Sequence, residues 1–180
     1  MMHRLLTDKN QLVVLGIIVL AVAMRLLPHP PNVTPVAALA LFGGAYIQDK
    51  RFALVLPLVV LMLSDLLLGL HDTLIFVYIG FMLTAVIGMI LRKRMNGLTI
   101  VTASLASSVM FFVLTNFGVW MTSDLYSADL SGLITCYIAA IPFFQNSVLG
   151  NLFFTALLFG GFALYARLAI TNRPRNDLIS

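Results

Sequence analysis

The sequence predicts an all-α integral membrane protein, a bundle of six spans with both termini in the cytoplasm. Of its 180 residues, 61% are hydrophobic and only 10% are charged, which is far from the composition of a water-soluble surface. Its Lys and Arg residues cluster in alternate connections between apolar runs, the pattern typical of cytoplasmic loops. This length suffices for a single transmembrane domain, residues 1–170, followed by a cytoplasmic tail at 171–180.

Six apolar runs supply the predicted spans. The first ends at Arg25, before a proline-rich break at residues 28–31. The second is short and carries Gly43 and Gly44, so we expect it to tilt, kink or enter the membrane with help from neighbouring helices. The predicted spans are residues 12–27, 34–48, 52–70, 73–91, 98–120 and 147–167.

The basic residues fix the orientation of these spans. With six crossings, only Arg25 lies on the outer side. The remaining basic residues all lie on the cytoplasmic side: Arg4, Lys9, Lys50, Arg51, Arg92, Lys93, Arg94, Arg167, Arg173 and Arg175. Such an asymmetry is strong positive-inside evidence.

A further apolar stretch, residues 130–144, lies between the fifth and sixth spans and contains Pro142. A full crossing here would place the final arginines outside, against the charge asymmetry. We therefore expect a short re-entrant or interfacial helix over the outer face of the bundle, with Asp129 or Ser131 as its N-cap.

Polar side chains inside apolar segments are costly unless they face protein or water. Here they gather toward the outer leaflet, where they are expected to converge on one outward-facing cavity. Aromatic rings, including Tyr126, would stack on a flat ligand and amides would supply hydrogen bonds. The candidate ligand-binding residues are Arg25, Asn32, Asp65, Tyr78, Asn116, Trp120, Tyr137, Asn146 and Asn151.

Several of these candidates also have a structural interpretation. Asp65 needs a partner, and Arg25 at similar depth is the natural one; the pair either ties two spans together or leaves Arg25 to bind an anionic group. Trp120 is also what an interfacial aromatic belt predicts. Asn116 and Asn151 are expected to line the cavity or to form interhelical hydrogen bonds rather than to face lipid.

Other residues bear on metals, packing and catalysis. His29, His71 and Cys136 are possible metal ligands, but their spacing matches no preformed site, and solvated loop histidines and a packed cysteine explain them equally well. Small residues at Gly80, Thr84 and Gly88, and again at Ala40 and Gly44, predict close helix packing. We find no catalytic, phosphate-binding or zinc motif, and expect neither an enzyme nor a cofactor nor a nucleic-acid partner.

The chain resembles the substrate-binding S components of energy-coupling-factor vitamin transporters, which are six-helix proteins with cytoplasmic termini. The matching sequence is RLLP at 25–28, PPNVTPVAA at 30–38 and LFGGA at 41–45. It also resembles a group of bacterial putative transport proteins, through TNFGVW at 115–120 and AIPFF at 140–144.

The first resemblance implies capture of a vitamin or similar micronutrient at a bacterial inner membrane. It also implies a partner module of a coupling subunit and two ATPases. The family's coupling motif, two alanines four residues apart in the first span, is absent; this span has Ala21 and Ala23.

Two other classes of function fit the composition. A non-transporting structural subunit or assembly factor would pair its outer polar residues with each other and fill its core. A channel is the weaker alternative, because polar residues are scarce in the cytoplasmic half of the spans.

Overall fold

The computed structural model describes residues 8–28 and 30–171. In these residues the chain forms helices without strands, and four of the helices are long and apolar enough to cross a membrane. The helices are α1 (Asp8–Leu26), α2 (Val36–Tyr46), α3 (Lys50–Leu68), α4 (Leu74–Leu91), α5 (Gly97–Thr122) and α6 (Leu130–Thr171). The prediction of an all-α membrane bundle is confirmed.

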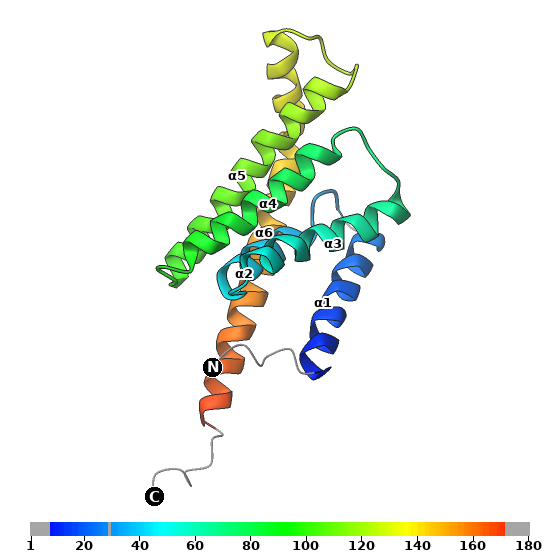
Figure 1. Ribbon diagram of the computed structural model, residues 1–180. Helices are drawn as coiled ribbons and strands as arrows, with labels where there is room; N and C mark the ends of the chain where they lie inside the picture. The colour runs from blue at the N-terminus through cyan, green and yellow to red at the C-terminus, as the bar shows by residue number, and fades with distance from the viewer. Residues whose placement is uncertain (1–7, 29, 172–180) are drawn as a thin grey trace, which may run out of the picture.

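The helix ends separate the connections into two groups. The start of α1, the α2–α3 and α4–α5 turns and the end of α6 lie toward the lower left of Figure 1, and the other three connections lie toward the upper right. We call the first group the basic side, because it carries Lys50, Arg51 and residues 92–94, and the second group the outer side. By the positive-inside rule, the basic side is the one expected to face the cytoplasm.

Helix α2 is about half as long as a membrane-spanning helix and lies at the centre of the bundle. Its 11 residues cover about 16 Å, against about 30 Å for the hydrocarbon core. Pro35 is its N-cap residue, and the prolines before it favour extended or turn backbone over a longer helix. It packs against α3, α4, α5 and α6, and most of its side chains are buried.

The α2–α4 contact depends on two glycines. A Cβ added to Gly44 would lie 2.0 Å from the carbonyl oxygen of Ala85, and one added to Gly88 would lie 2.2 Å from that of Leu41. The backbones therefore approach more closely than any larger residue allows, as the small-residue pattern predicted. Arg92 then caps α2 by donating from Nη2 to the carbonyl oxygens of Gly44 and Ile47.

The prediction of a separate re-entrant or interfacial helix is wrong. Residues 130–144 form the first part of α6, one helix of 42 residues that continues through Pro142. A proline interrupts the backbone ladder at one donor, whereas a complete break would leave several backbone groups unpaired at both new ends. Because α6 still crosses once, its C-terminal end lies on the basic side (Figure 1).

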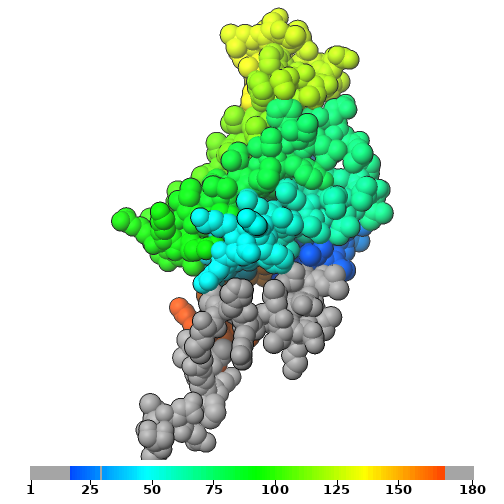
Figure 2. Space-filling model, in the orientation of Figure 1, coloured from blue at the N-terminus to red at the C-terminus, as the bar shows by residue number. Residues whose placement is uncertain are grey.

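Helix α6 is much longer than a bilayer requires, since 42 residues extend about 63 Å. Its first turns pair with the end of α5, and the two helices pack along each other. Figure 2 shows this hairpin, yellow-green to yellow, projecting past the outer ends of α3 and α4. Asp129 caps the start of α6 by accepting from the Gly132 amide at 2.8 Å, in agreement with one of the two predicted N-caps.

Candidate outer-side binding cavity

A cavity of about 660 Å³ occupies the outer half of the bundle, next to the first turn of α2. All three outer-side connections contribute to its walls, through Asn32, His71, Tyr126 and their neighbours, together with the outer halves of α4, α5 and α6. The short α2 accounts for this space, because its first turn, with Ala37 in the wall, begins where a full-length helix would continue outward. The cavity is therefore a consequence of the half-length central helix.

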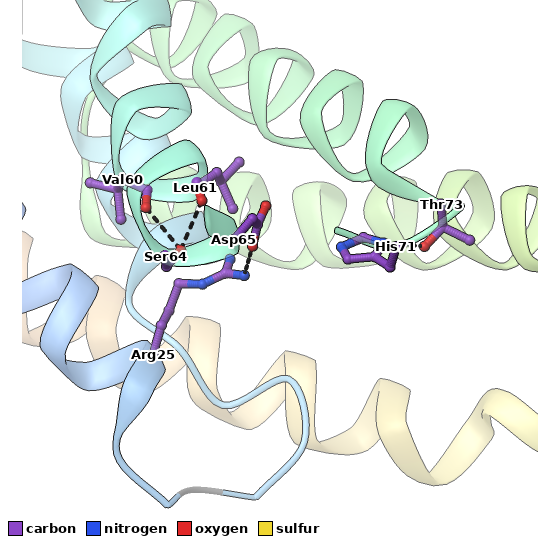
Figure 3. A network of polar contacts seen from close by, with 7 residues as sticks. All are labelled: Arg25, Val60, Leu61, Ser64, Asp65, His71 and Thr73. Atoms are coloured by element: carbon purple, nitrogen blue, oxygen red, sulfur yellow. Dashed lines mark hydrogen bonds and ion pairs between the residues drawn. The ribbon is translucent and has the colours of Figure 1, made fainter. Parts of the chain in front are cut away.

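Arg25 and Asp65 form a buried ion pair at the edge of this cavity. The Nη2 atom of Arg25 lies 2.6 Å from Oδ1 of Asp65, and the Asp65 side chain is 2% exposed. Figure 3 shows the guanidinium of α1 reaching the carboxylate of α3, beside Ser64, whose hydroxyl lies 2.9 Å from the carbonyl oxygens of Val60 and Leu61. The pair joins α1 to α3, the helix that α1 mainly contacts.

That the pair ties α1 to α3 does not exclude a role for Arg25 in binding an anionic group of a ligand. Arg25 lines the cavity, although its Nε atom is buried and has no hydrogen-bond partner among the described residues. Asp65 does not line the cavity; it lies behind Arg25, close to Tyr78 of α4. A carboxylate this deeply buried requires a cation, so Asp65 positions Arg25 rather than facing a ligand.

Asn151 lines the cavity, and its amide bonds to α5 through Nδ2 and to Thr155 of its own helix through Oδ1. Its Nδ2 atom lies within 3.0 to 3.2 Å of the Ser104 carbonyl oxygen and of the hydroxyls of Ser107 and Ser108. Its Oδ1 atom accepts from Thr155 at 3.4 Å. Asn151 is thus both a cavity residue and an interhelical hydrogen-bonding residue, the two roles that the sequence left open.

Asn116 lines the cavity with a side-chain amide that is only partly used within the protein. Its Nδ2 atom donates to the Phe112 carbonyl oxygen at 2.8 Å, and no described group donates to its Oδ1 atom. Cys136, on the facing wall, donates its thiol to the Asn116 backbone oxygen at 3.4 Å. The wall formed by Asn116 therefore combines an amide with the aromatic ring of Phe112 one turn earlier.

The aromatic walls agree with the prediction at Tyr126 and otherwise differ from it. Phe81, Phe111, Phe112, Phe143 and Tyr126 line the cavity, whereas Tyr78, Trp120 and Tyr137 do not. Trp120 donates from Nε1 to the Ser127 carbonyl oxygen at 2.9 Å, and the Tyr137 hydroxyl donates to that of Val113 at 2.7 Å. These two side chains hold the α5–α6 hairpin together.

The remaining predicted residues divide between the cavity and other surfaces. Asn32 lines the cavity from a turn in which its φ is 66°, a left-handed conformation that Asn tolerates better than most residues. Asn146 lies on α6 outside the cavity lining. The sequence did contain a signal for the missed wall of α5, because Ser108, Phe111, Phe112 and Thr115 recur at helical spacing on the face of Asn116.

The metal alternative gains no support from the described residues, among which no three His, Cys, Asp or Glu side chains are grouped closely enough to hold an ion. His71 lines the cavity, with its Nδ1 atom 2.9 Å from the Thr73 hydroxyl. His29 lies outside the described residues. Asp129 is held by the Gly132 amide and the Ser127 and Ser131 hydroxyls, which lower the pKa of its carboxyl.

A family comparison covers both the bundle and this cavity. Residues 6–173 match the sequence pattern of DUF6580, which is described as a family of unknown function. The chain belongs to the DUF6580 family. No curated protein and no solved structure matches the chain. The match extends from the first helix to the end of α6, so the half-length α2 and the cavity-lining helices all lie within the DUF6580 region.

Proposed function

We propose that this protein binds a small molecule in its outer-side cavity and serves in the uptake of that molecule. The cavity carries the proposal, because its volume of about 660 Å³ lies within the range of small-molecule sites. Three connections on one side of the bundle contribute to it, as access from that side requires. The resemblance to S components makes a vitamin or similar micronutrient the expected ligand and a bacterial inner membrane the expected location.

The walls favour a ligand with a flat ring and a polar or anionic end. Phenylalanine rings from α4, α5 and α6 supply apolar faces for stacking. At the α1 edge, Arg25 lines the cavity while its Nη2 atom contacts Asp65, so its positive charge lies beside the space that a ligand would occupy. Between these regions, Asn116 offers an acceptor and Thr115 and Ser147 add hydroxyls. This combination of apolar walls with few polar groups is typical of ligand sites.

The alternative of a structural subunit or assembly factor predicts a filled core. The polar network around Asn151 is indeed internally paired, as that alternative expects. However, a cavity of this size costs packing energy in a protein that has no ligand to place there. The cavity therefore favours the binding proposal.

The resemblance to S components implies an energising module of a coupling subunit and two ATPases, but binding in the cavity does not require this module. Ala21, in the region where the S components carry their coupling alanines, is 2% exposed and packs in the core against α2 and α3. A docking surface for a coupling subunit would therefore use other residues of α1 or other helices. Uptake by vesicles that contain only this protein would distinguish solitary function from a requirement for the module.

Two linked experiments test the binding proposal. Mass spectrometry of small molecules that co-purify with the detergent-solubilised protein identifies candidate ligands, and radiolabelled water-soluble vitamins provide probes for titration. Asn116→Ala should weaken binding about threefold to tenfold, the range for one neutral hydrogen bond. Asn146→Ala is the matched control, because it removes the same amide from outside the cavity.

A second pair of variants tests the space itself. Ala139 lines the cavity, whereas its neighbour Ile138 is 61% exposed and does not. Ala139→Phe should abolish binding by filling the cavity, and Ile138→Phe should leave it unchanged. Binding that survives Ala139→Phe and Asn116→Ala at wild-type affinity would refute the proposed site.

A further inference from the structure

A second hollow lies at the basic-side ends of α4 and α5, away from the outer cavity. It is an apolar groove of about 510 Å³, and none of its residues lines the cavity described above. Its apolar walls are Ile87, Ile90, Leu91, Leu98, Ala103 and Ala106. The two alanines leave the space between the larger side chains of the facing helices.

The interior of this groove offers no polar group to a ligand. Two threonines contribute to its walls, but both hydroxyls are used by the backbone of α5 and of the turn before it. The Thr99 hydroxyl donates to the Arg94 carbonyl oxygen at 2.8 Å, and the Thr102 hydroxyl donates to that of Leu98 at 2.9 Å. The groove is therefore suited to a hydrocarbon chain.

The rim of the groove, by contrast, is cationic. Lys93 and Arg94 line its end on the basic side, and neither forms an ion pair with a described residue. The turn that carries them is fixed by a capping box, in which Asn96 and Thr99 exchange hydrogen bonds of 2.9 and 3.0 Å. An apolar groove that ends at two free cations is complementary to an amphiphile with an anionic head.

The length of the groove distinguishes between a lipid and a protein helix as its occupant. From Leu98 to Ala106 the helix advances about 12 Å, less than half of the roughly 30 Å hydrocarbon core. A partner's transmembrane helix would need contacts through both leaflets, whereas a phospholipid chain occupies one. The rim lies at the basic-side ends of α4 and α5, and Lys and Arg at the cytoplasmic ends of spans attract anionic lipid.

We propose that this groove binds one anionic phospholipid of the basic-side leaflet. Its acyl chain lies between α4 and α5, and its phosphate contacts Lys93 and Arg94. The site is independent of the outer cavity, because the two share no residue.

Native mass spectrometry of the full-length protein in detergent, titrated with phosphatidylglycerol or phosphatidylcholine, tests the charge component. Wild type should hold one phosphatidylglycerol more tightly than phosphatidylcholine. The double variant Lys93→Gln/Arg94→Gln should weaken phosphatidylglycerol binding by about thirtyfold, at about 1 kcal/mol for each basic residue. Lys50→Gln/Arg51→Gln makes the same charge change at another basic-side turn, and should retain wild-type affinity.

The apolar component needs its own variants. Ala106→Phe should fill the groove and reduce phosphatidylglycerol binding, with a smaller reduction for Ala106→Leu. Leu105→Phe is the matched control, since Leu105 is 39% exposed on the same helix and does not line the groove. Thermal unfolding of each variant verifies that the bundle is intact.

Three results would overturn the lipid site. The first is equal affinity for the two lipids, and the second is an equal loss on substituting the α2–α3 turn. The third combines two observations: millimolar glycerol phosphate displaces phosphatidylglycerol, and both Ala106→Phe and Ala106→Leu bind phosphatidylglycerol with wild-type affinity. That result would mean that the cations bind free phosphate without the groove.

Discussion

Gly88→Ala should destabilise the bundle although alanine is the better helix former. Its added methyl would lie 2.2 Å from the Leu41 carbonyl oxygen and 3.0 Å from the Gly44 Cα atom. Both neighbours are backbone atoms, so relief requires α2 and α4 to move apart. Overpacking of this kind costs about 1 to 3 kcal/mol, which exceeds the roughly 1 kcal/mol that alanine gains over glycine in a helix.

The same substitution at Gly160 provides a matched control. No atom lies within 4 Å of a Cβ added there, so Gly160→Ala should leave stability unchanged or raise it by up to about 1 kcal/mol. Reversible unfolding in mixed micelles with increasing SDS measures both variants. Equal stability of Gly88→Ala and Gly160→Ala would refute the argument that direct backbone contact holds α2 against α4.

Three further predictions concern polar contacts. Asp65→Leu should cost about 3 to 5 kcal/mol by leaving Arg25 buried without its partner, whereas Asp65→Leu with Arg25→Met should recover most of that loss in the same SDS assay; an equally unstable double variant would contradict this. Arg92→Gln should destabilise the protein by about 1.5 to 3 kcal/mol through lost bonds to the α2 carbonyl oxygens, and the exposed Lys50→Gln should not. Because the pKa of Asp129 is lowered from 3.8 in the folded protein, its contribution to the cap of α6 is present above pH 3.8 and is lost as the pH falls through the lowered value. Hydrogen exchange at the Gly132 amide should accelerate in that acidic window relative to amides within α5, and Asp129→Asn, which keeps a capping oxygen, should remove the pH dependence.

The membrane class and the position of the polar residues follow from the sequence because they depend on hydropathy and charge totalled over each segment of the chain. Hydropathy and basic residues add up over each segment, so the apolar runs and their sidedness could be predicted before any packing was known. The same reasoning found Arg25, Asn32, Asn116 and Asn151, which all line the cavity. Each is a polar residue that lipid would not tolerate.

The rotation of each helix about its own axis, which decides the side chains that face the cavity, does not follow from total hydropathy or charge. Trp120 and Tyr137 were expected in the cavity but bond to the backbone of the hairpin. Phe111 and Phe112 line the cavity instead; their hydrophobicity does not separate them from phenylalanines that face lipid, and only their helical spacing from Asn116 does. Lipid and the protein interior are both apolar, so hydrophobicity alone does not report which face of a span is buried.

By itself, then, the sequence determined the all-α membrane class, the charge asymmetry between the two sides and the gathering of costly polar groups near the outer side. Tertiary structure alone decided that α6 continues through Pro142, that α2 is a half-length central helix and that a cavity lies beyond its first turn. The physical reason is that burial cost is a property of each residue, whereas the continuity of a helix and the space beside it depend on which neighbours pack against it.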